Sequence, residues 1–244
     1  MIMRHLLLAA AMGGTAATAS VSGWAAEPQS SIAPENAKGT PVYVPPKVGA
    51  PRGRVGGGAR GPSSDMPRLT VLAPDHPGLT TEAQPVLYWY LNRPTQNSVE
   101  FTLMTDDQIA PVLEVKLADA GQPGVHKLSL ADHGVTLELN ATYRWYVSVV
   151  QDPSRRSRDV IAGGVIQRVN IPNGLPEKLA AAKSEDKAKL LASEGIWYDA
   201  IAALSSSIDG APSNETLREQ RAGLLDQVGL TDVATFDRKG SGNK

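Results

Sequence analysis

Hydrophobic and polar residues alternate with a period of two through the middle of the chain, between about residues 68 and 172. In SVEFTLM, for example, Val99, Phe101 and Leu103 fall on one face. Such alternation is typical of half-buried strands in antiparallel sheets. The segment holds seven candidate strands: RLTVLA, PVLYWYL, SVEFTLM, VLEVKLA, VHKLSL, TYRWYVSVV and VIAGGVIQRVNI. Seven short strands separated by turn residues predict a mainly β domain, folded as an antiparallel two-sheet sandwich.

One stretch of this domain predicts the type of sandwich. In LELNATYRWYV, Leu137 stands six residues before Tyr143, and the strand then alternates through Trp145. The spacing resembles the tyrosine corner of immunoglobulin-like and fibronectin-like sandwiches, in which a tyrosine hydroxyl holds the loop before its own strand. An ordinary edge-strand tyrosine is the alternative. We expect Tyr143 and Trp145 to be structural on either interpretation.

After residue 172 the apolar period changes to about 3.6 residues, which is typical of amphipathic helices. Ser184 is expected to cap one helix, and Trp197, Ile201 and Leu204 share one face of the next. The pattern resembles a little over one tetratricopeptide repeat. It predicts a small helical appendage over 173–230, with Trp197 in an apolar contact, followed by a disordered tail over 231–244.

The N-terminal part of the chain has the composition of a targeting signal followed by an irregular segment. A positive charge at Arg4 precedes an apolar run and small residues, which predicts a signal peptide over 1–25, cleaved near Ala25 or Ala26. Residues 26–67 are rich in proline and glycine and show no apolar period, so they predict a leader and strap. The glycines would let this strap lie close against the sandwich. An exported protein in the periplasm or outside the cell is the expected location.

Charge and cysteine content exclude several classes of function. Lys and Arg number 24 against 25 Asp and Glu, a formal net charge of -1 that gives no overall attraction to nucleic acid. The sequence has no cysteine, so it has no disulfide, thiolate metal site or cysteine nucleophile. No stretch after the signal peptide is long and apolar enough to predict a transmembrane helix.

A glycine-rich run raises the possibility of nucleotide binding. Gly56, Gly58 and Gly61 fit the G-x-G-x-x-G spacing of a dinucleotide-binding loop. That loop needs a strand before it and a helix beginning at its last glycine, whereas Pro62 follows here and the next predicted element is a strand. We interpret the run as part of the strap and predict no cofactor.

The other residue types that carry chemistry form no recognisable constellation. His76, His126 and His133 lack the spacing of metal ligands, and the sequence has no nucleophile elbow or HExxH motif. We therefore predict no catalytic residue and no metal site. An aromatic carbohydrate-binding face formed by Trp89, Tyr90, Trp145 and Tyr146 is an alternative, and an unrecognised hydrolase using His76 or His126 is another.

Arginines are concentrated in the turn QDPSRRSRDV. Arg155, Arg156 and Arg158 crowd its tip, and the strap adds Arg52, Arg54 and Arg60. Guanidinium groups bind carboxylate and phosphate groups in bidentate fashion. These six arginines are therefore a candidate interaction surface for an unknown protein or an anionic envelope polymer. Solvated charge at a turn is the simpler interpretation.

Three blocks of the sequence resemble one protein family. PRGRVGGGARG, LAPDHPGLTTEAQPVLYWYL and YRWYVSVVQDPSRRSRDVIAGGVIQRV are similar to the domain of unknown function 928 family of bacterial exported proteins, and GIWYDAIAAL is similar to its C-terminal end. The resemblance implies no catalytic residue, because the family has no established activity. The expectation is a non-enzymatic, exported protein that acts as a protein-interaction or envelope-associated module.

Overall fold

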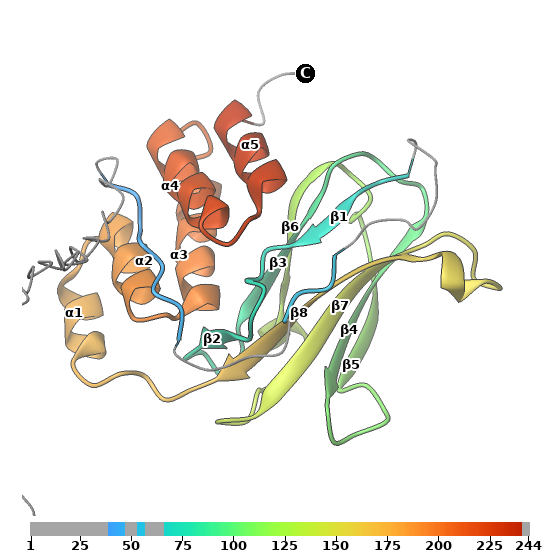
Figure 1. Cartoon of the computed structure of the whole chain (residues 1–244), viewed down its shortest axis with the longest axis horizontal. Coiled ribbons are helices and arrows are strands. Elements are labelled where there is room, and N and C mark those ends of the chain that lie inside the picture. The colour runs from blue at the N-terminus through green and yellow to red at the C-terminus, as the bar shows by residue number, and fades with distance from the viewer. Residues whose placement is uncertain (1–38, 47–52, 57–65, 241–244) are drawn as a thin grey trace, which may run out of the picture. The chain divides into compact units, whose positions relative to one another are not determined.

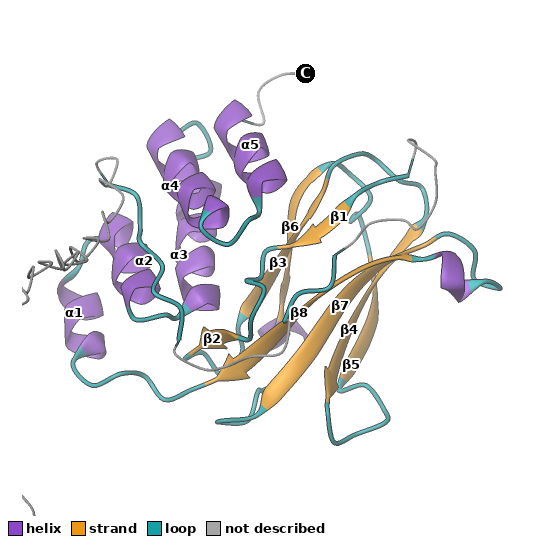
Figure 2. Cartoon of the chain, viewed as in Figure 1, coloured by secondary structure: helices purple, strands orange, loops and turns teal. Residues whose placement is uncertain are grey.

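The computed structural model describes residues 39–46, 53–56 and 66–240 (Figure 1). The described residues form eight strands in two sheets and five α-helices, as Figure 2 shows. Helices take up about 32% of the described residues and strands about 27%. The sandwich and the helical end are both present, and the helical part is larger than a small appendage.

The smaller sheet has three antiparallel strands in the order β1-β3-β6: β1 (Leu69–Val71), β3 (Val86–Leu91) and β6 (Gly124–Ser129). The larger sheet has five strands in the order β2-β8-β7-β4-β5: β2 (Gly78–Thr80), β8 (Val160–Arg168), β7 (Thr142–Val150), β4 (Ser98–Thr105) and β5 (Leu113–Leu117). All seven predicted strands are present. Strand β2, which has three residues and pairs with β8 in parallel, was not among the predicted strands.

The core between the sheets is built from the alternating residues that the sequence indicated. Phe101 of β4 and Trp145 of β7 are completely buried, and their rings stack with centroids 6.1 Å apart. Tyr143 of β7 is buried as well, and its hydroxyl accepts a hydrogen bond of 3.0 Å from the backbone N–H of Glu138. This bond ties the loop before β7 to the start of the strand.

The five helices follow the last strand: α1 (Leu175–Ala181), α2 (Ser184–Ser193), α3 (Trp197–Gly210), α4 (Glu215–Asp226) and α5 (Thr231–Lys239). Ser184 is the first helical residue of α2 instead of its cap, and Lys183 takes the capping position without a side-chain bond. Helix α5 occupies most of the segment predicted to be a disordered tail. Its nine residues are held by tertiary packing, because Val233 and Ala234 are buried and Phe236 contacts Tyr90 of β3.

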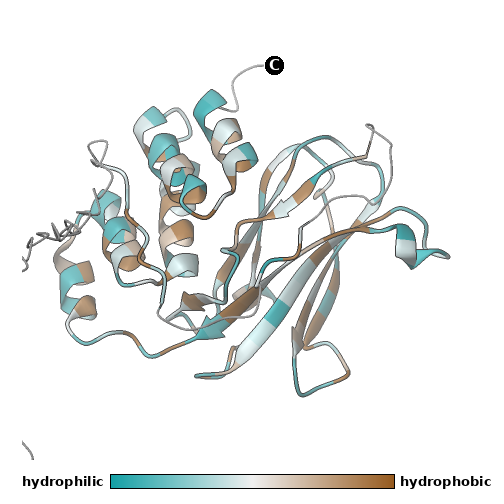
Figure 3. Ribbon diagram, viewed as in Figure 1, coloured by the Kyte–Doolittle hydropathy of each residue, from teal (hydrophilic) through white to brown (hydrophobic). Residues whose placement is uncertain are grey.

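Helix α3 is fastened to the sandwich by three consecutive side chains. The indole N–H of Trp197 donates to the carbonyl of Leu72 at 2.9 Å, and the hydroxyl of Tyr198 donates to the carbonyl of Val165 in β8 at 3.0 Å. Asp199 accepts hydrogen bonds from the Thr81 N–H at 2.9 Å and from the Thr81 hydroxyl at 2.6 Å. The first turn of α3 therefore contacts both sheets, and Figure 3 shows hydrophobic segments in α3 and β8.

The described parts of the strap lie against both the helices and the sandwich. The Val44 N–H donates to the Ala192 carbonyl of α2 at 3.1 Å, while Tyr43 is buried edge-on against Trp197. Further along the strap, Val55 pairs with Gly163 at the edge of β8, with N–H···O distances of 2.8 and 3.1 Å. The predicted signal peptide and the glycine run beyond Gly56 lie outside the described residues.

Candidate functional site

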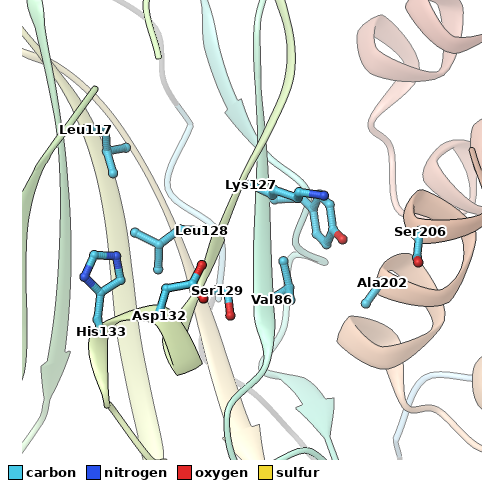
Figure 4. A pocket seen from close by; sticks show the side chains of 10 residues that line it. Val86, Leu117, Lys127, Leu128, Ser129, Asp132, His133, Ala202 and Ser206 are labelled. Carbon is cyan, nitrogen blue, oxygen red and sulfur yellow. The ribbon is translucent and has the colours of Figure 1, made fainter. Parts of the chain in front are cut away.

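A cavity of about 510 Å³ lies between β3, β6 and α3 (Figure 4). Val86 and Tyr88 come from β3, and Ala202 and Ser206 come from α3. Lys127 extends from β6 toward α3, while Leu117, Leu128 and His133 border the opposite side of the cavity. The cavity lies where α3 crosses the outer face of the smaller sheet, which is the face that carries Tyr88 and Lys127.

Two further cavities continue this one along α3. A cavity of about 440 Å³ toward α2 shares Val86 and Ala202 with it. A cavity of about 740 Å³ toward α4 and α5 shares Tyr88 and Lys127 with it. Together they form one groove, which we call the α3 groove and define by Val86, Tyr88, Lys127 and Ala202, the residues that neighbouring cavities share.

The open end of the α3 groove carries charges of both signs. The Lys127 ammonium group donates to Asp209 at 2.6 Å, and both side chains are more than half exposed. This hydrogen bond raises the pKa of Lys127, and burial raises the pKa of the Tyr88 hydroxyl beside it. In the cavity toward α4 and α5, the Arg221 guanidinium group makes a buried bidentate ion pair with the Asp237 carboxylate, with N···O distances of 2.6 and 2.7 Å. These pairings leave no excess charge that would select a purely anionic ligand.

The other end of the α3 groove contains the buried carboxyl group of Asp199. Burial raises the pKa of this group, while hydrogen bonds from Thr80 and Thr81 act in the opposite direction. Because the donors to its oxygens come from the end of β2 and the residue after it, Asp199 joins α3 to the larger sheet. We assign it a structural role.

Strand β6 presents unused backbone groups beside the α3 groove. The Tyr88 carbonyl accepts from Leu72 at 2.9 Å, so Tyr88 faces β1 and its neighbours Leu87 and Trp89 face β6. Backbone groups alternate in direction along an antiparallel strand. Lys127, which lies opposite Tyr88, therefore directs its N–H and C=O away from β3. Within the described part of the chain, β6 pairs with β3 alone.

The predicted arginine surface is divided between different environments. Arg155, Arg156 and Arg158 lie exposed on the turn between β7 and β8, where Arg156 donates to Asp159 at 2.6 Å and to Glu100 at 2.7 Å. Arg54 does not join them, because it donates to the carbonyls of Ala73 and Val228 and so bridges the sandwich and the helices. Arg52 and Arg60 lie outside the described residues.

The aromatic residues considered for carbohydrate binding have other positions. Trp89 and Trp145 are 1% and 0% exposed, and Tyr90 packs against Phe236. The side chain of Tyr146 covers Gly163, where an added Cβ would lie 2.4 Å from its ring. These four residues therefore form no exposed aromatic face.

The three histidines of the described residues, His76, His126 and His133, have different partners. His76 stacks on Tyr43, His126 stacks on Trp89, and His133 borders the central cavity. Among the described residues, no group of three or more His, Cys, Asp or Glu side chains is placed to hold a metal ion. No helix in the described ranges has the length and hydropathy needed to cross a membrane.

Sequence reasoning missed the α3 groove, although one signal for it existed. PVLYWYL is apolar at nearly every position, and five of the six residues of β3 are buried. A strand that is apolar on both faces is covered on both faces. The run thus indicated that another layer covers β3, but it could not indicate that the covering helix leaves β6 open.

The fold and the groove define a class: a β-sandwich protein whose smaller sheet carries a helical layer. The model of the family described as Domain of Unknown Function (DUF928) matches residues 55–237, about three quarters of the chain, and the protein belongs to this family. The match begins at Val55 in the strap and ends at Asp237 in α5, so it includes both sandwich and helices. No curated protein matches the chain.

Proposed function

We propose that this protein is an exported, non-enzymatic binding module that takes an extended segment of a partner protein as an added strand along β6. The main support is the position of Lys127. Its side chain lines two adjoining cavities of the α3 groove, and its backbone groups point to the open edge. An added strand gains affinity from main-chain hydrogen bonds and specificity from pockets for alternate side chains.

We also infer that the sandwich is of the immunoglobulin type. The chain crosses between the sheets from β3 to β4, from β5 to β6 and from β6 to β7, as in Greek-key sandwiches. The hydrogen bond of the Tyr143 hydroxyl to the loop before β7 supports the same inference. Sandwiches of this kind serve many unrelated functions, so the binding proposal rests on the groove and not on the fold.

The surroundings of β6 specify the chemistry of the partner segment. One face of an added strand would meet Tyr88, Ala202 and the Lys127–Asp209 pair, and the other would meet Leu117 and Leu128. Successive side chains of a strand point to opposite faces. The preferred segment therefore has small or polar residues that alternate with aliphatic ones.

The test compares two substitutions of Lys127. Proline at this position removes an N–H that points away from β3, so the β3–β6 pairing can persist while an added strand loses a hydrogen bond. Lys127→Gln keeps the N–H and removes only the charge. Peptides selected from a random display library on the purified protein should bind Lys127→Pro at least about tenfold more weakly, and Lys127→Gln nearly as well.

The controls separate a lost site from a lost fold. Circular dichroism and the melting temperature of Lys127→Pro should match those of the original protein. Selected peptides that bind both variants equally well would contradict strand addition at β6. Export is tested separately, by locating the protein in cell fractions and sequencing its N-terminus.

A further inference from the structure

We propose that a second copy of this protein pairs with the free edge of β5, so that two five-stranded sheets join into one across a two-fold axis. Strand β5 ends the larger sheet, and within the described residues its only strand neighbour is β4. Its sequence, LEVKL, places Glu114 and Lys116 on one face, where both are exposed. This inference is independent of the function proposed for β6.

The backbone of β5 is directed correctly for such pairing. The Val112 N–H donates to the Leu103 carbonyl at 2.8 Å, so Leu103 faces β5, and its directly paired residue Leu113 faces β4. By alternation Val115 and Leu117 also face β4. Glu114 and Lys116 then direct their N–H and C=O groups to the free edge.

The bonds at the other edge of the sheet give the same alternation. Gly163 of β8 exchanges two hydrogen bonds with Val55 of the strap, so Gly163 faces outward and its neighbours Ala162 and Gly164 face β7. The same alternation, followed through the registers of β7 and β4, shows that the backbone N–H and C=O groups of Glu114 and Lys116 point to the free edge of β5.

The charges select one register. When Val115 lies opposite Val115 of the second copy, each Glu114 lies opposite a Lys116, and both outward residues form hydrogen-bonded pairs. Moving the axis by one residue places Glu114 against Glu114, or Lys116 against Lys116. Opposite charges across a strand pair stabilise it and like charges destabilise it. The segment is thus complementary to itself, as a two-fold interface requires.

Exposed apolar residues in the turn before β5 would be covered by the second copy in this dimer. The turn before β5 reads QIAPV, in which Ile109 is 100% exposed and Val112 is 36% exposed. In the selected register, Val112 lies beside Ala118 of the second copy, directly after its β5. Consecutive exposed apolar residues are unusual on a monomer surface and are typical of contact sites.

The experiment is sedimentation velocity over a concentration series from about 1 to 300 μM, the range suited to a small interface. The purified protein should dimerise, and Lys116→Glu and Glu114→Lys should each raise the dissociation constant at least about tenfold. The double variant Glu114→Lys with Lys116→Glu exchanges the charges and should restore dimerisation. Glu185→Lys, at an exposed site on α2, is the matched control and should leave the dimer unchanged.

A cross-link tests the register independently of the charges. Because the chain has no cysteine, Val115→Cys introduces a single thiol. Residues opposite each other in a non-hydrogen-bonded pair lie within disulfide distance, so mild oxidation should give a covalent dimer, and adding Lys116→Glu should suppress it. A protein that stays monomeric up to 300 μM, or single charge reversals that dimerise as well as the original, would overturn the proposal. In that case Glu114 and Lys116 protect the edge against pairing.

Discussion

The larger sheet ends differently at its two edges. On one side, β8 is covered by β2 over Gly78–Thr80 and by the strap at Val55, and α3 packs beside it. On the other side, β5 carries exposed Glu114 and Lys116, and the described residues supply it with no further strand. The same chain therefore seals one edge of its sheet and leaves the other accessible.

The sequences of the two strands reflect this difference. Strand β8 reads VIAGGVIQR and is buried on both faces at most positions, whereas β5 alternates between half-buried and exposed residues. A strand that is covered on both faces is mostly apolar. An accessible edge strand carries charged side chains, which limit the strands that can pair with it. The sealed edge is therefore expected to contribute stability, and both of our binding proposals concern accessible edges, at β5 and β6. Four variants test this division.

The largest effect is expected for Trp197→Ala on the sealed side. Trp197 is 0% exposed, donates to the Leu72 carbonyl and contacts Tyr43 of the strap. Removing a buried tryptophan costs about 3–5 kcal/mol of unfolding free energy. Urea denaturation followed by circular dichroism measures this. Val112→Ala on the open side should change it by less than about 0.5 kcal/mol, and equal effects would contradict the comparison.

Gly164→Ala tests how closely the surrounding residues, among them Tyr198 of α3, pack against β8. An added Cβ would lie 2.7 Å from the Cβ of Ala73 and 3.2 Å from the Tyr198 hydroxyl. Overpacking of this kind destabilises a protein by about 1–3 kcal/mol, which the urea midpoint should reveal. Gly210→Ala is the matched control, because a Cβ at the end of α3 meets no atom within 4 Å. A loss at Gly210 as large as that at Gly164 would contradict the packing argument.

The sandwich was more predictable than the connections that hold the helices to it. Alternation revealed seven of the eight described strands, including the three-residue β1 with Leu69 and Val71 on one face. Strand β2 escaped because Leu79 is its only apolar side chain, so it shows no alternation. The helical period located α2 and α3, and the helical segment predicted over 173–230 also includes α1 and α4. Helix α5 was predicted to be disordered, since a short segment with few apolar residues is not a stable helix by itself. It is stabilised by contacts with residues distant in sequence, such as that of Phe236 with Tyr90 of β3.

The α3 groove and the polar interactions around it could not be predicted either, because they too join residues that are distant in sequence. Asp199 is bonded to residues more than 100 positions away, and the Arg221–Asp237 pair joins two helices that the sequence did not relate to each other. Arg54 resembled the other arginines in sequence. Only its folded position, between the carbonyls of Ala73 and Val228, separates it from the turn arginines.

Asp199 should make the sealed side sensitive to pH. Burial raises the folded pKa of this carboxyl group above its unfolded value near 3.8. The folded state then holds the proton more tightly, so the contribution of Asp199 to stability is present in acid and falls as the pH rises above about 4. The difference in unfolding free energy between the original protein and Asp199→Asn, measured from pH 4 to pH 7, should decrease with pH. A difference that grows with pH would show that the hydrogen bonds from Thr80 and Thr81 outweigh burial.

The smallest effect on stability is expected at the turn between β7 and β8. Arg155 and Arg156 make ion pairs through guanidinium groups that are more than half exposed, and Arg158 is exposed as well. Ion pairs at exposed sites contribute about 0–1 kcal/mol. Changing all three to glutamine should therefore leave the melting temperature nearly unchanged. If the turn is also a contact site for anionic polymers, binding to polyphosphate should weaken and lose its salt dependence in this variant, but not in one with Lys178, Lys183 and Lys187 changed to glutamine. Equal binding of polyphosphate by both variants would mean that the turn arginines interact only with the carboxylates beside them.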